Sequence, residues 1–555
     1  MTDKTTLRPT RGIRWQRATD LRKHAPCRGR IAAAALVAAS VLTIGSTSPS
    51  EVGAAAALDT GTLSAISQIT GAQAMWNQGF AGQGIGVAVI DTGVARVAGL
   101  DAPGKVIDGP DLSFDSQNPA TAYTDGFGHG THIAGIIAGS DVLPTASGKG
   151  CATCLGSSAY TDTTKFVGIA PAAKIVNVKV GAYDGSVDVT QVIAAIDWVV
   201  QHRNDPGLNI RVLNLSFGTD SLQPAQIDPL AYAVEVAWKA GIVVVAAAGN
   251  DGDAPGPLAN PAYSPSVIAV GTTDPMGTLT TNDDIVAPFA QHGTPERPVD
   301  VAAPGVSVAS LAVPGSFVDQ NVTTGKVGTR FQRASGTSQS TAVVSGLAAL
   351  ILSKYPTALP DAIKAYLKAV TTGIGPDGSN ISSKNSGNKQ DDYEGAGSAN
   401  VLQVAASDVF EKLKWLKTIV AVPTTGTGTG TIEGSRGTYH VTINGAPLAG
   451  ELDIFGKRVN TSLLAIATGA QISWIGGLWN GSIWTGSAWT GTRWSSTSWT
   501  GSDWTGARWS GARWSDAVWD GARWSGARWS GARWSSGGWS GARWSGARWS
   551  GQAWS

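Results

Sequence analysis

Two uninterrupted apolar runs indicate strands that are buried on both faces. Residues 84–90 read Gly-Ile-Gly-Val-Ala-Val-Ile, and residues 241–248 read Gly-Ile-Val-Val-Val-Ala-Ala-Ala. Strands with one solvated face alternate apolar and polar residues, so runs without alternation are typical of a parallel sheet covered by helices. Asp91 directly follows the first run. Its carboxylate is therefore expected at the C-terminal end of a strand, where open α/β sheets carry their chemistry.

Two segments of small and apolar residues predict helices that pack closely on such a sheet. One begins at His129 and continues as Gly-Thr-His-Ile-Ala-Gly-Ile-Ile-Ala-Gly, and the other begins at Ser338 and reaches Leu350. A side chain at a helix N-terminus lies beside free backbone N–H groups and the positive end of the helix dipole, which favour developing negative charge. Ser338 is therefore expected where a nucleophile would be assisted.

Asp91, His129 and Ser338 are the residue types of an activated serine nucleophile. A serine hydroxyl needs an imidazole to take its proton, and the imidazole needs a buried carboxylate to fix its tautomer. Asn250, at the end of the second apolar run, adds an amide that can donate to the oxyanion formed when a carbonyl is attacked, typically worth about 3–4 kcal/mol. Each residue alone is more often a cap, turn or structural residue, and only the combination indicates catalysis.

From about residue 65 to residue 410 the chain resembles the subtilisin-like serine proteases. The order Asp, His, Ser is that family's order. The matching motifs are Asp91-Thr-Gly, His129-Gly-Thr-His-Ile-Ala-Gly, Gly-Thr-Ser338, Val-Leu-Asn-Leu-Ser216-Phe-Gly and Asp300-Val-Ala-Ala-Pro-Gly. The resemblance implies an α/β fold with a doubly wound, mostly parallel sheet and helices on both faces. It also implies a serine endopeptidase that acts on proteins or peptides.

The resemblance implies roles for individual residues as well. Asp91, His129 and Ser338 would be the catalytic triad, with the Ser338 backbone amide and the Asn250 side chain forming the oxyanion hole. Substrate would lie extended along Ser216, Phe217 and Gly218, by strand addition. Small residues beside Asn250 would line an uncharged, roomy pocket that suits an apolar or aromatic side chain before the scissile bond; they are Ala247, Ala248 and Gly249.

The N-terminus is typical of a secretory signal, assigned to residues 1–57. Residues 1–30 contain nine Lys or Arg against two Asp, and an apolar stretch from Ile31 to Ile44 follows, before a small-residue segment that ends at Ala57. A retained membrane anchor is the alternative, although the stretch is shorter than the roughly 20 residues of a spanning helix. The peptidase domain is assigned to residues 58–410. It shows no pro-domain of the kind that subtilisin relatives carry, so either folding needs none or another part of the chain assists it.

Two cysteines, Cys151 and Cys154, lie in a Gly-, Ser- and Thr-rich loop. In an oxidising compartment we expect them to form a local disulfide. A zinc site is the weaker reading because two thiols supply half the usual ligands, and a thioredoxin-like context is absent. No cofactor is predicted; calcium is common among subtilisin relatives, but no acidic loop has convincing ligand spacing.

The C-terminal part divides into a helix and Thr/Gly linker (411–435), a short β segment (436–470) with strands at residues 439–443 and 451–454, and a tryptophan repeat (471–555). From Trp474 to Trp554 a tryptophan recurs every five residues. The repeat is similar to pentapeptide-repeat proteins, which form a right-handed β-helix, but Trp replaces their Leu or Phe. The alternative is a flexible chain with exposed indoles.

The repeat region carries eight Arg against three Asp. Trp rings next to Arg side chains favour binding to an envelope polymer or to a lipid interface. We therefore expect a secreted enzyme that is retained on the cell envelope. The whole chain has a net charge of +1 and 15% charged residues, which argues against a nucleic-acid partner. The competing function is a binding protein on an inactive protease scaffold, with the repeat as its binding region.

Overall fold

The fold is built on a central, mostly parallel sheet. The computed structural model describes residues 59–117, 120–142, 160, 162–252, 256–374, 395–402, 426–443, 445–484 and 508–509. Seven strands lie in the order β11-β7-β6-β4-β1-β3-β2, all paired in parallel, and β8 (Ile285–Val286) adds antiparallel to β7. The seven are β1 (Gly86–Asp91), β2 (Val106–Asp111), β3 (Lys174–Lys179), β4 (Ile210–Leu215), β6 (Val243–Ala247), β7 (Ile268–Asp274) and β11 (Val301–Pro304).

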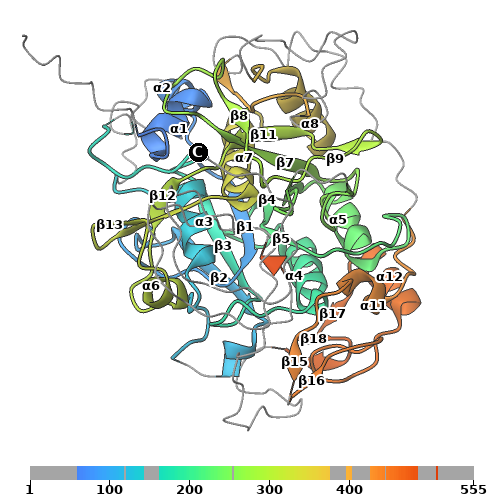
Figure 1. Ribbon diagram of the computed structural model, residues 1–555. Coiled ribbons are helices and arrows are strands. Elements are labelled where there is room, and N and C mark those ends of the chain that lie inside the picture. The colour runs from blue at the N-terminus through green and yellow to red at the C-terminus, as the bar shows by residue number, and fades with distance from the viewer. Residues whose placement is uncertain are drawn as a thin grey trace, which may run out of the picture. The chain divides into compact units, whose positions relative to one another are not determined.

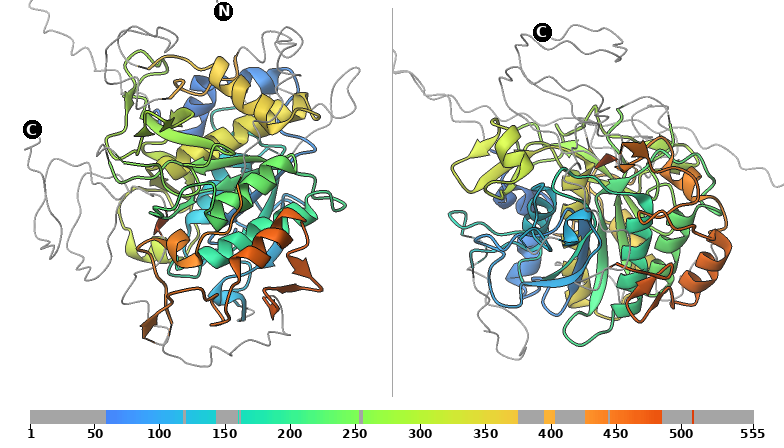
Figure 2. Two further views of the ribbon diagram at one scale, coloured as in Figure 1. Left: turned by 90° about the vertical axis from the view of Figure 1, so that its right-hand side faces the viewer. Right: turned by 90° about the horizontal axis from the view of Figure 1, so that it is seen from below.

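Helices cover both faces of this sheet (Figures 1 and 2). One face carries α3 (His129–Ala138) and α7 (Thr337–Lys354), and the other carries α4 (Val189–His202) and α5 (Pro229–Lys239). Every residue of β1 and β6 is buried, as the apolar runs predicted. The expected α/β fold with a doubly wound, mostly parallel sheet is confirmed for the described residues. Helix α7 begins at Thr337, one residue before the predicted start.

Smaller elements surround the sheet. Three of them, β12, β14 and β13, form a separate antiparallel sheet in that order. The N-terminal and peripheral elements are α1 (Leu63–Ile69), α2 (Ala72–Asn77), a 3₁₀ turn η1 (Phe114–Gln117), β9 (Gly293–Thr294), β10 (Arg297–Pro298), β12 (Val308–Leu311), α6 (Phe317–Asn321), β13 (Lys326–Val327), β14 (Phe331–Ala334) and α8 (Pro360–Ala369).

Residues 426–484 form a body, here called the docking module, that packs on the outer side of α4 and α5. It contains α11 (Ile432–Arg436), β15 (Thr442–Ile443), β16 (Ala446–Pro447), α12 (Thr461–Gly469), β17 (Trp474–Ile475), β18 (Leu478–Trp479) and β19 (Ser482–Ile483). The expected division of this region differs from the structure, because α11 spans the proposed boundary at 435/436 and α12 lies inside the proposed β segment. The cap Asn460, which accepts from Leu463 N at 3.1 Å, was the sequence signal for α12.

Where the structure describes it, the Thr/Gly stretch predicted as a linker is packed against α5 and the residues just before that helix. Thr427 N donates to Gln226 O and Gly430 N donates to Ile227 O, each at 2.6 Å. Gly428 has a left-handed backbone and lies so close to the ring of Tyr232 that a Cβ atom would collide with it. The glycines of this stretch therefore serve close approach rather than flexibility.

The first three tryptophans of the repeat are buried in the docking module. Strands β17, β18 and β19 pair antiparallel in chain order, and Trp479 and Trp484 are fully buried. These three repeats therefore form neither the parallel coils of a β-helix nor a chain with exposed indoles, and both expectations are wrong for them. The reason is tertiary: the indole N–H of Trp474 donates to Ala194 O at 2.8 Å and that of Trp479 to Asp197 Oδ2 at 2.9 Å, both on α4.

Of the later repeats, the structure describes only the backbone of β20 (Arg508–Trp509), which pairs antiparallel with β5 (Phe217–Gly218). The predicted signal segment, the Cys151/Cys154 disulfide, the helix expected at the start of residues 411–435 and the remaining repeats lie outside the described residues. Among the described helices, none is both long enough and apolar enough to span a bilayer.

Candidate active site

The first pair of candidate catalytic residues lies in direct contact. Asp91 is the last residue of β1 and His129 is the first residue of α3, and His129 Nδ1 lies 2.8 and 3.0 Å from the two carboxylate oxygens of Asp91. Both side chains are buried, with 1% of His129 and none of Asp91 exposed. A buried carboxylate at Nδ1 fixes the imidazole tautomer and leaves Nε2 as the basic nitrogen.

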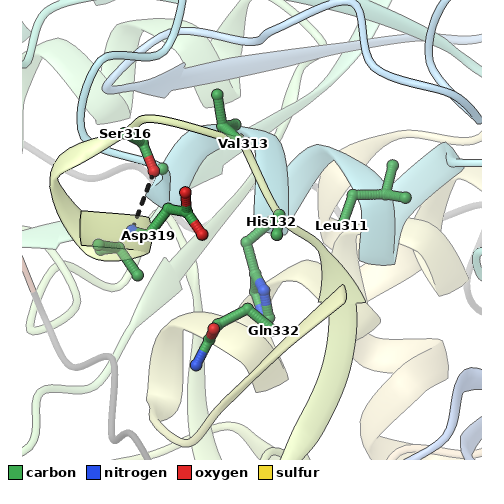
Figure 3. A pocket seen from close by; sticks show the side chains of 9 residues that line it. His132, Leu311, Val313, Ser316, Asp319 and Gln332 are labelled. Atoms are coloured by element: carbon green, nitrogen blue, oxygen red, sulfur yellow. Dashed lines mark hydrogen bonds between the residues drawn. The ribbon is translucent and has the colours of Figure 1, made fainter. Parts of the chain in front are cut away.

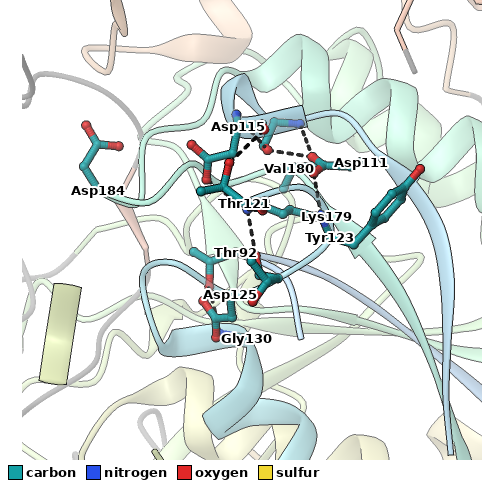
Figure 4. Close-up of polar contacts among 12 residues, drawn as sticks. Thr92, Asp111, Asp115, Thr121, Tyr123, Asp125, Gly130, Lys179, Val180 and Asp184 are labelled. Atoms are coloured by element: carbon teal, nitrogen blue, oxygen red, sulfur yellow. Dashed lines mark hydrogen bonds and ion pairs between the residues drawn. The ribbon is translucent and has the colours of Figure 1, made fainter. Parts of the chain in front are cut away.

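A second carboxylate, Asp125, holds the start of the helix that carries His129 (Figure 4). Asp125 accepts from Gly128 N, Thr131 N and Thr92 Oγ1, each at 2.7 Å. Thr92 Oγ1 in turn accepts from Gly130 N at 2.9 Å, so the segment after β1 and the start of α3 are tied together. Burial raises the pKa of Asp125, against the lowering effect of these hydrogen bonds. Asp125 was not among the residues predicted from the sequence, although an Asp shortly before a helix start is a capping signal.

Asn250 is held beside the helix that carries Ser338. Its Oδ1 accepts from the backbone N of Thr337 at 2.9 Å, which orients the amide. The Nδ2 group is buried and has no hydrogen-bond partner among the described residues. A buried amide donor left without a partner costs free energy unless a ligand satisfies it. The structure therefore brings a preorganised N–H donor next to the N-terminus of α7, adjacent to Ser338.

The segment expected to bind substrate also lies against α7. Ser216 Oγ is 3.5 Å from the carbonyl oxygen of Ser338 and accepts from Asn214 Nδ2 at 3.1 Å. Ser338 itself is fully buried in this structure. The following residues form β5, and its pairing partner in the described chain is β20, in the register Arg508↔Gly218 and Trp509↔Phe217. Strand β5 thus receives an antiparallel strand by addition, the geometry expected for an extended substrate.

The small residues expected to line the specificity pocket lie directly beside β5. Ala248 O accepts from Ala259 N at 2.9 Å, and Ala259 also packs on Gly218, where no Cβ atom would fit. Ala247 and Ala248 are fully buried, and Gly249 has φ of 112°. Residues 247–249 and the end of β5 are therefore connected through contacts with Ala259.

The second histidine of the His129 motif has a different environment. His132 is buried on α3 and lines a small cavity with Leu311, Val313 and Gln332 (Figure 3). Burial, followed by the charge of His129, lowers the pKa of His132 to about 3, so it is neutral over the working range of an enzyme. A neutral, enclosed imidazole is suited to packing rather than to proton transfer.

The described residues contain no group of three or more His, Cys, Asp or Glu side chains arranged to hold a metal ion. The donor set that calcium prefers, several converging carboxylate and carbonyl oxygens, is thus not supplied by acidic clusters in this part of the chain.

The part of the chain that holds these residues is similar to known serine proteases. A family model described as "Subtilase family" matches residues 82–397, a range that holds all four candidate chemical residues and ends before the docking module. Serine protease AprX of Bacillus subtilis (strain 168) is 37% identical over 298 residues, which is 52% of this chain but only 62% of the length of AprX.

Two further relatives are covered more fully. Subtilisin DY of Bacillus licheniformis is 34% identical over 301 residues, or 54% of this chain and 87% of the relative. Subtilisin Savinase of Lederbergia lenta is 32% identical over 304 residues, or 55% of this chain and 89% of the relative.

Proposed function

Because the chain belongs to the subtilase family, whose model matches more than half of its length, we propose that it is a serine endopeptidase with Asp91, His129 and Ser338 as its triad. The observation that carries this proposal is the fully buried contact between His129 Nδ1 and both oxygens of Asp91. A charged carboxylate is costly to bury, and a pair of this geometry orients an imidazole for proton transfer. The substrates are proteins or peptides.

The reaction runs through an acyl-enzyme. Ser338 attacks the peptide carbonyl while His129 takes the hydroxyl proton, and Asp91 stabilises the imidazolium that forms. His129 then donates this proton to the leaving amine, so that the C–N bond breaks and the acyl group stays on Ser338. Water repeats the sequence and releases the acid.

The oxyanion of each tetrahedral intermediate is assigned to Asn250 Nδ2 and the backbone N–H of Ser338. The orientation of Asn250 by Thr337 N and the absence of any other partner for its Nδ2 among the described residues support this role. Because the donor is already in place before reaction, no reorganisation is needed as charge develops. Substrate pairs with residues 216–218, and the small Ala247, Ala248 and Gly249 leave room for an apolar or aromatic side chain before the scissile bond.

The test is covalent labelling with a serine-directed fluorophosphonate. The wild-type chain should label, and Ser338→Ala should not, while both should give the same melting temperature. Ser340→Ala is a matched control, since Ser340 lies in the same helix but donates to Ala303 O. Failure of folded wild type to label would leave the alternative, an inactive scaffold that binds through the repeat, which the comparisons do not support.

We also propose secretion and retention on the cell envelope through the tryptophan repeat. The eight Arg of residues 485–555 against three Asp favour an anionic or lipid surface. A truncation at residue 471 would remove the buried Trp474, Trp479 and Trp484 and damage the docking module, so the chain should end after Trp484 instead. Release of this truncated enzyme into the medium supports retention by the repeat; cell fractions identical to those of the full chain contradict it.

A further inference from the structure

The strand expected to bind substrate continues directly into residues held by the docking module. After Gly218, the hydroxyl of Thr219 donates to the carbonyl oxygen of Ser435 at 2.6 Å, in a buried environment. Asp220 then accepts from the backbone N of Thr438 at 2.7 Å and from its hydroxyl at 2.5 Å. The two residues that directly follow β5 are therefore fixed by a part of the chain more than 200 residues away.

Ser435 of the docking module also contacts Asn260, in the segment that packs against β5. The backbones of Thr219 and Asn260 exchange two hydrogen bonds, of 3.0 and 2.9 Å, and Asn260 follows Ala259, which packs against Gly218. Asn260 Nδ2 lies 3.4 Å from Ser435 Oγ and donates to Asp228 Oδ1 at 3.0 Å. Ser435 thus contacts both segments that border the expected substrate position.

This contact rests on a rigid base formed by the N-termini of α4 and α5. Asp228 caps α5 by accepting from Leu230 N at 2.9 Å, and it also accepts from Ser435 Oγ at 3.0 Å. Asp188 caps α4, and its Oδ2 accepts from Arg436 Nε at 2.6 Å with both side chains fully buried. Helix α11 is therefore anchored to two helix caps through adjacent residues, Ser435 and Arg436.

We propose that the docking module is a positioning element of the active site, in which Ser435 and Thr438 hold the end of β5 in the conformation that pairs with extended peptides. The proposal rests on the proposed function, because it assumes that substrate pairs with residues 216–218. Main-chain pairing requires strand atoms to be held in place before binding, and small misplacements lower rates strongly. Peptides with several residues before the scissile bond depend on this pairing, whereas minimal substrates do not reach it.

The test compares a long with a short substrate in the full chain. Thr219→Val keeps the side-chain shape and removes the hydroxyl that reaches the module. The measured quantity is the ratio of kcat/KM for a peptide amide with five residues before the scissile bond to kcat/KM for an ester with one. Loss of one hydrogen bond to a positioning contact should lower this ratio by about fivefold to tenfold, mainly through KM of the long substrate. Asp220→Ala is the second variant, should Thr219→Val fold poorly.

The matched control loosens the module at its other side. Gln201 on α4 accepts from Trp474 N at 2.7 Å and donates to Trp474 O at 3.1 Å, so Gln201→Ala weakens docking away from β5. We expect Gln201→Ala to lower the melting temperature and leave the ratio unchanged. Equal ratios in wild type, Thr219→Val and Asp220→Ala would overturn the positioning role while the proposed function stands. A wild-type chain that cleaves neither substrate and takes no fluorophosphonate label would instead overturn the proposed function itself.

Discussion

The two faces of the central sheet are covered in different ways. Helices α3 and α7 lie close to the sheet and to each other through small residues; a Cβ atom at Gly130 would meet Gly93 O, and one at Gly346 would meet Ile169. Helices α4 and α5 instead carry a second layer, the docking module, which is joined to them by carboxylates. The first face brings reactive groups together by close backbone approach, and the second fixes a distant segment by buried polar contacts.

This difference separates catalysis from stability. Replacing a reactive side chain on the α3/α7 face should change the rate of catalysis with little effect on folding, because the helices around it pack independently of that side chain. Removing one partner of a buried charge pair between the docking module and helices α4 and α5 should lower stability, because the charge left behind has no solvent to compensate it. Four substitutions test this separation, and the one at Asp91 is expected to have the greatest effect.

Asp91→Asn should lower kcat by about 10⁴-fold at neutral pH, because the amide would hold His129 in the wrong tautomer. The side chain keeps its size, so the melting temperature should stay close to that of wild type. Steady-state kinetics on a peptide amide and a thermal melt measure the two quantities. A loss of tenfold or less would show that Asp91 does not orient the base.

Arg436→Met should lower the free energy of unfolding by about 3–5 kcal/mol, because it leaves Asp188 buried and uncompensated. Denaturant unfolding measures this loss, with Glu433→Gln as a control, since Glu433 is partly exposed and pairs with Arg436 at 3.2 Å. Adding Asp188→Asn to Arg436→Met removes the unpaired charge while keeping the cap acceptor, and should recover much of the loss. A double variant as unstable as the single one would contradict this explanation.

Asn250→Leu should lower kcat by about 10²–10³-fold, the range known for removal of the oxyanion donor in subtilisin itself. The substitution also removes the acceptor of Thr337 N, which should reduce stability by only about 1 kcal/mol. Kinetics and unfolding measured on one preparation separate the two effects. A large loss of stability with an unchanged rate would place Asn250 with the structural residues.

Asp197→Asn should change how stability depends on pH. Burial, opposed by hydrogen bonds from Trp479, Ser473 and Thr468, raises the pKa of Asp197 to about 6 in the folded chain, above its usual value near 4 when unfolded. The folded state therefore holds a proton that the unfolded state has lost, so this group lowers stability as pH rises from about 4 to 6 and not further above 6.

The Asn variant should lack this change, with a gain of up to about 3 kcal/mol at pH 7 and none at pH 4. The difference in free energy of unfolding between variant and wild type, measured across pH, isolates the contribution of Asp197, because the contributions of the other titrating groups are the same in both chains. A difference that does not vary between pH 4 and pH 7 would show that Asp197 titrates normally.

For the part of the chain that holds the candidate catalytic residues, local sequence patterns were largely enough. The apolar runs that end at Asp91 and before Asn250, and the small-residue helices that begin near His129 and Ser338, are local patterns, and strand and helix periodicity encode them directly. They were sufficient for a parallel sheet covered by helices and for four candidate residues, while the resemblance to the subtilisin-like proteases supplied the doubly wound topology. Asp125 was not predicted as a site residue, because a single capping Asp is a weak signal until its three hydrogen-bond donors are known.

For the described part of the C-terminal region, by contrast, long-range contacts set the structure and local patterns did not reveal it. The five-residue tryptophan period and the Thr/Gly stretch resembled a repeat array and a linker. In the structure, however, Trp474 and Trp479 are buried on α4, Trp484 is buried against Trp479, and Gly428 packs on Tyr232. Whether an indole is buried depends on a partner surface far away in the chain, such as Ala194 O and Asp197 of α4. No local pattern specifies that partner, since the contact arises only after both segments have folded.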